Sequence, residues 1–141
     1  MSSSSIIKTT IIILLSLFFF IAGVSKFISI FDKIFLSHQF MIDVYDKLTY
    51  EWNDLLSLSL DSLILRKFIG SLELIISILI FIPSLQLISI FIGLLIMIFA
   101  SISHFLLEDP FIAYIVPVIA GSSCLYIISL LLSQKSVHKK Q

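Results

Sequence analysis

Residues 9–24 read TTIIILLSLFFFIAGV, and the aliphatic run from Ile11 to Leu15 within them decides the fold class. Isoleucine favours strands in water, but a strand of a membrane barrel alternates apolar and polar side chains, which this run does not. In lipid, every backbone polar group must be paired within a helix or in a closed barrel. The run therefore predicts a membrane-spanning helix.

The composition indicates the same class. Of the 141 residues, 59% are hydrophobic and 13% are charged, whereas soluble domains carry about 25% charged residues. Nine Lys and Arg residues balance nine Asp and Glu residues, which leaves no basic excess to attract nucleic acid. The lone cysteine, Cys124, cannot form an internal disulfide or a zinc site of the cysteine type. We expect an integral membrane protein in contact with the lipid bilayer and with no nucleic-acid partner.

We predict a single all-α domain over residues 1–141, an integral membrane four-helix bundle. Each apolar stretch provides roughly 20 residues, which is about 30 Å of helix. Pro83 turns the chain after the second stretch, because proline cannot continue a helix. A cleaved signal peptide stays open as an alternative for the first stretch, since Lys8 precedes its apolar core and small residues follow it. The expected crossings are residues 9–26, 63–82, 85–107 and 111–132, and a basic tail follows at 134–141.

The long connection between the first two crossings, residues 27–62, has a helical pattern of its own. Its apolar and aromatic residues recur at alternating steps of four and three, which keeps them on one helical face. We expect one or two amphipathic helices that lie on the membrane surface or cap the bundle, and the face would pack over helix ends or bind a partner. The residues of this face are Phe27, Phe31, Ile34, His38, Met41, Tyr45, Leu48, Trp52 and Leu55.

Both termini are predicted to be cytoplasmic. Lysine and arginine near the crossings favour the cytosolic side of a membrane. The two tails carry only basic charges, whereas the opposite side mixes basic with acidic residues. The tail lysines are Lys8, Lys135, Lys139 and Lys140.

The charged residues of the crossings gather on one side of the membrane. If the crossings alternate in direction, that side holds Lys26, Arg66, His104 and Asp109, and Glu73 lies two helical turns deeper than Arg66. A carboxylate at mid-membrane costs about 2.5–3.5 kcal/mol on insertion scales. We therefore expect Glu73 to face the bundle interior, with Lys26 or His104 as its donor.

Two interpretations of these polar residues stay open: a buried ion pair that fixes helix register, or a site that binds a polar ligand or relays a proton. His104 and Glu108, four residues apart on one helical face, could also pair with each other. A lone inward histidine makes a poor metal site. The sequence contains no nucleophile elbow, phosphate-binding loop or paired carboxylates. We expect no catalytic residue, no metal and no cofactor.

Small residues and one proline are predicted to let the helices approach closely. These contacts would serve packing within the bundle or homo-oligomer formation, and both stay open. Proline also removes one backbone hydrogen bond, so we expect a bend in the fourth helix. The predicted packing residues are Gly70, Ser89, Gly93, Pro117 and Gly121, with Ala113 on the same stripe as the last two.

Three motifs resemble those of one membrane-protein family. Residues 65–73, LRKFIGSLE, resemble the second-helix motif of the novel acetylcholine receptor chaperone family, which is itself DoxX-like. Gly23-Val24-Ser25-Lys26 is similar to that family's Gly-x-x-Lys at the end of the first helix. His104, Asp109-Pro110 and Tyr114 resemble its His-x-x-x-x-Asp-Pro-x-x-x-Tyr. The similarity runs from the first helix to the end of the fourth.

This resemblance implies a four-helix protein of the endoplasmic reticulum that assists the folding and assembly of pentameric ligand-gated receptors. Its polar core would be Lys26, Arg66, Glu73, His104 and Asp109. We predict a non-enzymatic, multi-pass membrane chaperone or assembly factor that binds client membrane proteins by lateral helix contact. Two alternatives stay open: a DoxX-like redox-associated subunit, in which Glu73 and His104 orient a quinone-type ligand or pass a proton, and a purely structural membrane protein.

Overall fold

The computed structural model describes residues 3–27 and 38–138. Within these ranges the chain forms five helices and no strand, so the predicted all-α class is confirmed. The helices are α1 (Ser3–Ser25), α2 (His38–Leu56), α3 (Ser62–Leu79), α4 (Gln86–Leu106) and α5 (Phe111–His138).

Three helices in the described ranges are long and apolar enough to cross a membrane. They are α1 over Ser5–Ser25, α4 over its whole length and α5 over Phe111–Ser133. The second predicted crossing, residues 63–82, forms α3, but its 18 residues include Arg66, Lys67 and Glu73. The structure therefore shows a helical protein with three candidate spans, and α3 differs from them in its charge content.

The helix ends differ from the predicted boundaries. α1 begins at Ser3 rather than at residue 9, since the polar residues before the apolar run continue the helix. α3 ends at Leu79 rather than at residue 82, because the backbone before Pro83 tightens to i→i+3 hydrogen bonds, from Phe81 N–H to the carbonyl oxygen of Ile78 and from Ile82 N–H to that of Leu79. α5 passes through Pro117 and continues to His138, so part of the predicted tail belongs to the helix.

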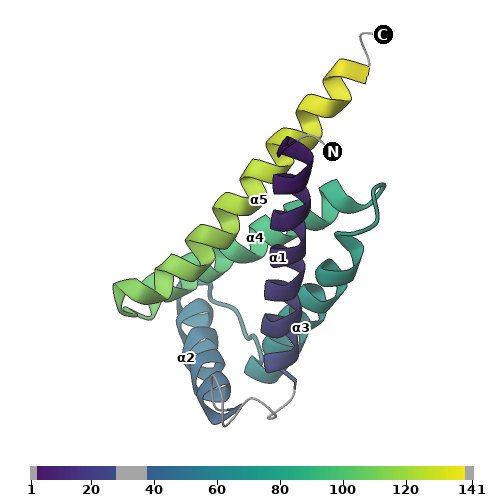
Figure 1. Cartoon of the computed structure of the whole chain (residues 1–141). Coiled ribbons are helices and arrows are strands. Elements are labelled where there is room, and N and C mark those ends of the chain that lie inside the picture. The colour runs from purple at the N-terminus through teal and green to yellow at the C-terminus, as the bar shows by residue number, and fades with distance from the viewer. Residues whose placement is uncertain (1–2, 28–37, 139–141) are drawn as a thin grey trace.

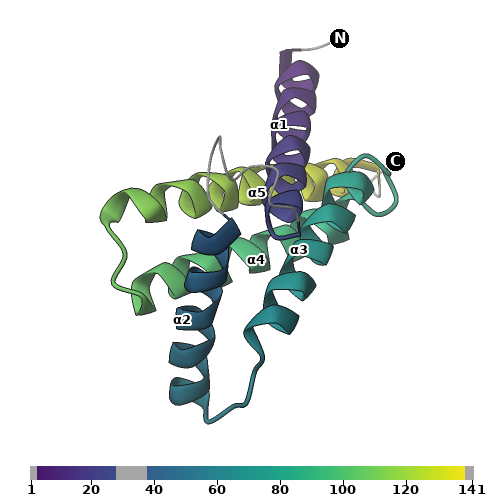
Figure 2. The same ribbon diagram turned by 90° about the horizontal axis from the view of Figure 1, so that it is seen from below.

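The helices form two antiparallel pairs, α1 with α3 and α4 with α5 (Figures 1 and 2). Contacts of α1 with α5 and of α3 with α4 join the pairs. In Figure 1 the start of α1, the turn between α3 and α4 and the end of α5 lie toward the upper side. α2 lies toward the other side, against α3 and α4.

Small residues allow α1 and α3 to approach closely. A Cβ atom added to Gly70 would lie 3.0 Å from Cβ of Lys26, and one added to Gly23 would lie 3.0 Å from the carbonyl oxygen of Gly70. Further along the same pair, Oγ of Ser16 donates a hydrogen bond to the carbonyl oxygen of Ser77 over 2.7 Å. Backbones that meet at small residues are typical of packed membrane helices.

The apolar core lies where α1, α3, α4 and α5 meet. Phe19 of α1 is fully buried and fills the space beside Gly93, where an added Cβ atom would lie 2.7 Å from its ring. The core residues are Ile12, Leu15, Phe19, Ile76, Ile80, Ile90, Ile96, Met97, Ala120, Cys124 and Ile127.

α2 covers part of the predicted amphipathic region 27–62, whose residues 28–37 lie outside the described residues. Tyr45 and Leu48 of α2 are buried, and Trp52, Leu65, Phe99 and Leu107 pack against them. Acidic and basic residues such as Asp46 and Lys47 are exposed. Leu55, predicted on the apolar face, lies in the last turn of α2 and is 59% exposed.

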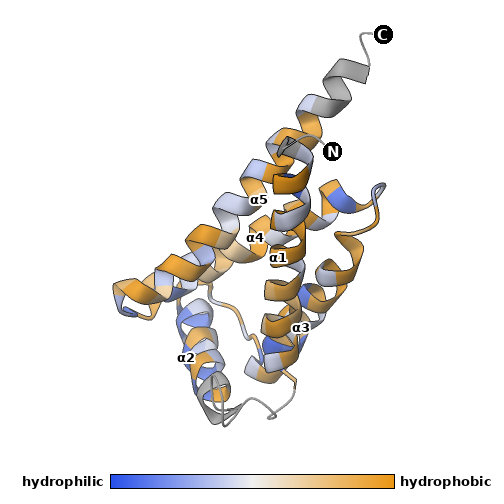
Figure 3. Cartoon of the chain, viewed as in Figure 1, coloured by the Kyte–Doolittle hydropathy of each residue, from blue (hydrophilic) through white to orange (hydrophobic). Residues whose placement is uncertain are grey.

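The outer surface of the bundle is largely apolar, and its charged side chains are partly inside. On α3, Ile64 and Ile78 are 69% and 66% exposed, whereas Glu73 is 3% exposed. Figure 3 shows hydrophobic residues over most of α1, α4 and α5, and hydrophilic ones on α2 and near the start of α3. This distribution fits a lipid environment, because a water-soluble monomer rarely exposes such large apolar patches.

Candidate functional site

Lys26 and Glu73 form a buried ion pair between the end of α1 and the middle of α3. Nζ of Lys26 donates to Oε2 of Glu73 over 2.6 Å and to the carbonyl oxygen of Ala22 over 3.1 Å. The two residues are 7% and 3% exposed. Because Gly70 lets the end of α1 lie against α3, the ammonium can fold back to reach the carboxylate. Glu73 thus faces the interior, as predicted, and its donor is Lys26 rather than His104.

Arg66 lies two helical turns before Glu73 on the buried face of α3 and is 7% exposed. Within the described residues, its Nη1 is shielded from solvent and has no hydrogen-bond partner. A guanidinium keeps its charge, and a buried charge without an acceptor costs several kcal/mol. We call Lys26, Arg66 and Glu73 the buried charge cluster, which holds two positive charges and one negative charge.

Tyr45 of α2 is 7% exposed and lies in a buried cluster against which Leu65, the residue before Arg66, packs. Burial raises the pKa of the Tyr45 hydroxyl well above its usual value, the charge of Glu73 raises this pKa further, and the charge of Arg66 lowers it. The hydroxyl therefore stays protonated and keeps a hydrogen to donate. With Arg66, it gives this part of the bundle the capacity to bind a hydrogen-bond acceptor, above all an anionic one.

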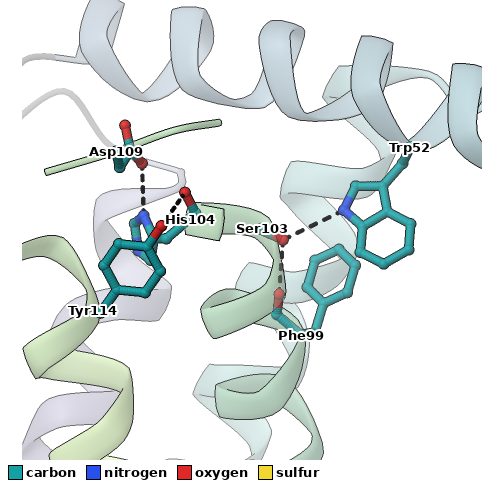
Figure 4. Close-up of polar contacts among 6 residues, drawn as sticks. All are labelled: Trp52, Phe99, Ser103, His104, Asp109 and Tyr114. Carbon is teal, nitrogen blue, oxygen red and sulfur yellow. Dashed lines mark hydrogen bonds and ion pairs between the residues drawn. The ribbon is translucent and has the colours of Figure 1, made fainter. Parts of the chain in front are cut away.

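His104, near the end of α4, makes a separate polar contact (Figure 4). Its Nδ1 lies 2.7 Å from Oδ2 of Asp109, and the two side chains are 30% and 33% exposed. The Tyr114 hydroxyl donates to the carbonyl oxygen of His104 over 3.1 Å, which joins the end of α4 to α5. At such exposure an ion pair contributes about 1 kcal/mol or less. The contact therefore acts mainly to shape the turn between α4 and α5.

His104 pairs with Asp109 rather than with Glu108, the alternative that the sequence left open. α4 ends at Leu106, so the spacing of four residues no longer places the two side chains on one helical face. Glu108 instead has φ 53°, in the left-handed region, and its side chain is exposed. This reversal brings Asp109 back toward His104, whose carbonyl oxygen accepts a hydrogen bond from the Asp109 backbone N–H over 3.1 Å.

Trp52 attaches α2 to α4. Its ring stacks on Phe99 with a centroid distance of 5.1 Å, and its Nε1 donates to Oγ of Ser103 over 3.4 Å (Figure 4). The Ser103 hydroxyl donates in turn to the carbonyl oxygen of Phe99 over 2.7 Å. These contacts hold α2 near the buried charge cluster.

The predicted packing residues lie at contacts between helices of the same chain. Ser89 is 1% exposed, and Pro117 is also buried. A Cβ atom added to Gly121 would lie 3.5 Å from Cβ of Met97, an ordinary contact, so α4 and α5 need no glycine there. Gly70 and Gly93, in contrast, have no room for a side chain.

An apolar groove of about 230 Å³ lies between α1 and α5. Both helices are candidate membrane spans. The only hydroxyl in its lining, on Ser123, donates to the carbonyl oxygen of Ile119 over 2.9 Å. The groove is lined by Ile11, Leu14, Leu15, Phe18, Val116, Ile119, Ala120 and Ser123.

The structure thus separates the predicted polar residues into two groups: Lys26 and Glu73 with Arg66 beside them, and His104 with Asp109. Across the described part of the chain, no group of three or more His, Cys, Asp or Glu side chains could hold a metal ion. Tyr45, on which the charges of Glu73 and Arg66 act, was not predicted as a site residue, because it fitted an apolar helical face.

No protein-family model and no curated protein sequence matches this chain. The resemblance to the receptor chaperones therefore depends on the three motifs at residues 23–26, 65–73 and 104–114. Two of these motifs contain the residues of the buried charge cluster, and the third contains the contact between His104 and Asp109.

Proposed function

We propose that the chain is a single DoxX-like domain over residues 1–141 with four membrane crossings, in which α3 is the fourth span and α2 is an amphipathic helix at one membrane face. The surface of α3 supports this topology. Ile64, Phe68 and Ile78 are exposed, whereas Arg66 and Glu73 are buried within the protein. Lipid would therefore contact mainly apolar side chains. An 18-residue helix is about 27 Å long, close to the thickness of a bilayer core.

In this proposal both termini are cytosolic and the membrane is that of the endoplasmic reticulum. The test is labelling of single-cysteine variants in sealed microsomes with an impermeant maleimide, after the buried Cys124 is replaced by alanine. Gln141→Cys is expected to react at once, and Ser57→Cys only after permeabilisation. Labelling of both positions from the same side would indicate three crossings and contradict the proposal.

We further propose that the protein is a non-enzymatic chaperone or assembly factor that binds helices of client membrane proteins laterally. The observation that carries this function is the apolar groove between α1 and α5. Ala120 and Ser123 are small, so an incoming helix can approach the backbone of α5 closely. The resemblance of the three motifs to receptor chaperones favours pentameric ligand-gated receptors as the clients.

The proposed function is tested by affinity purification from native membranes in mild detergent. Ser123→Leu fills the groove, and Ser122→Leu is its matched control, because Ser122 is exposed and does not line the groove. The wild-type chain and the control are expected to recover the same multispanning client, which Ser123→Leu should lose. Recovery of the wild-type chain alone, or full recovery by Ser123→Leu, would contradict the proposal.

A redox role is not proposed. In that alternative, Glu73 and His104 orient a quinone-type ligand or pass a proton. Oε2 of Glu73 instead lies 2.6 Å from Nζ of Lys26, and Nδ1 of His104 lies 2.7 Å from Oδ2 of Asp109. Since each residue has its own partner, the geometry does not favour a shared ligand.

A further inference from the structure

The positive charge of Arg66 is not balanced within the buried charge cluster. Glu73 already accepts a hydrogen bond from Lys26 over 2.6 Å, and Nη1 of Arg66 has no partner in the described part of the chain. One additional negative charge would make the cluster neutral and would give Nη1 an acceptor. We propose that Arg66 binds the phosphate group of an acidic phospholipid.

The chemistry of the guanidinium favours a phosphate over a halide or a neutral carbonyl group. Its planar fork of donors matches two oxygens of a phosphate, and the resulting charge-assisted hydrogen bonds are stronger than neutral ones. The Tyr45 hydroxyl, on which the charge of Arg66 acts, is a further donor on α2. A phosphodiester carries one negative charge, which is the charge that the cluster lacks.

The position of Arg66 favours a lipid over a free anion. Arg66 lies in the second turn of α3, near the end of the bundle that carries α2, where headgroups would lie. The outward face of the same helix presents the exposed apolar side chains of Ile64, Phe68 and Ile75, along which acyl chains can pack. These side chains lie on the opposite side of α3 from Arg66, so they place the helix among acyl chains, and the phosphate nearest to Arg66 would be that of a headgroup at this end of the bundle.

Binding requires a local movement, because Nη1 of Arg66 is shielded from solvent in this structure. α2 is the element best suited to move, since its buried apolar side chains are Tyr45 and Leu48 only, within the residues of α2 whose side chains are described. The charges of Arg66 and Glu73 also act on the hydroxyl of Tyr45 in α2. This site rests on the proposed topology, in which the start of α3 lies at one membrane face, but not on the proposed chaperone function, which rests on the groove between α1 and α5.

The test is the thermal unfolding of the full-length chain in a phosphate-free sugar detergent, with and without phosphatidylglycerol. We expect the lipid to raise Tm of the wild-type chain by about 3–6 °C, as for about 1 kcal/mol of stabilisation. Arg66→Met should abolish this increase of Tm. In lipid-free detergent, the Tm of Arg66→Met should equal or exceed the wild-type value, because the variant lacks the unpaired buried charge. Lys67→Met removes an exposed cation from the same helix and should retain the increase.

Three results would overturn the site. The first concerns Arg66→Met. An equal increase of Tm by the lipid in this variant would place the binding elsewhere, and a Tm below the wild-type value in lipid-free detergent would indicate a purely structural role for Arg66. The second is an equal effect of phosphatidylcholine, whose choline cation cancels the phosphate charge. The third is an equal effect of inorganic phosphate, which would assign the stabilisation to a free anion rather than to a lipid.

Discussion

The buried charge cluster predicts an asymmetric response to the loss of its members. Removing one partner of a buried ion pair costs about 3–5 kcal/mol. Glu73→Met leaves two buried cations without a counter-charge, so its cost should lie near the upper end of this range. Lys26→Met leaves Glu73 on the same buried face of α3 as the cation Arg66, and its cost should lie near the lower end. For a chain of this size, about 4 °C of Tm corresponds to 1 kcal/mol, so the losses should be about 20 and 12 °C.

The double variant Lys26→Met with Glu73→Met separates pairing from packing. Exchange of a buried pair for apolar residues of similar size is often nearly neutral, so we expect its Tm within about 4 °C of the wild-type value. The assay is the fluorescence of Trp52, the single tryptophan, whose stacking on Phe99 is lost on unfolding. Lys67→Met, the exposed control, should change stability by about 0.5 kcal/mol or less. A double variant as unstable as the sum of the two single variants would refute the reasoning.

Four further variants test the packing and the helix ends. Gly70→Ala should lower the free energy of unfolding by about 1–3 kcal/mol, since its Cβ would lie 2.8 Å from an aromatic ring. The control, Gly121→Ala, should stay within about 1 kcal/mol of the wild-type value. An equal loss in both variants would contradict the close approach of α1 and α3. Asp61→Ala should lower the free energy of unfolding by about 1 kcal/mol and speed amide hydrogen exchange in the first turn of α3, because the Asp61 side chain caps that helix. Unchanged exchange would refute the cap. Tyr114→Phe should lose about 0.5–1.5 kcal/mol in thermal unfolding with its hydrogen bond to His104, and a wild-type Tm would show that this bond adds no stability.

The helical elements could be predicted from local patterns. Long apolar runs predicted α1, α4 and α5, and each of these helices is a candidate span. The proline at position 83 predicted the turn between α3 and α4, where Nε2 of Gln86 also donates to the carbonyl oxygen of Ile80 over 2.8 Å. These features depend on residues close together in the sequence, so composition and spacing are sufficient to predict them.

The partners of the charged residues could not be predicted in the same way. Lys26 and His104 were equal candidates for Glu73, because the depth of a residue in a helix does not fix the rotation of one helix against another. That rotation depends on the close approach of Gly23 and Gly70, which brings the end of α1 against α3. Likewise, a helical spacing rule paired His104 with residue 108 and failed because α4 ends before that residue.

The charges of α3 exclude it from the candidate spans when only composition is counted, whereas the structure buries two of these charges inside the protein. Composition counts a charged residue wherever it points, and each charge at the centre of an isolated helix costs about 2.5–3.5 kcal/mol on insertion scales. In the folded chain, Glu73 is neutralised by Lys26 from α1, and both are buried away from lipid. In the proposed four-crossing topology, α3 therefore depends on α1 to enter the membrane, and the ion pair links the stability of the two helices. The same reasoning explains why Gly70 lies between Arg66 and Glu73: a side chain there would push away the end of α1 that carries the neutralising ammonium.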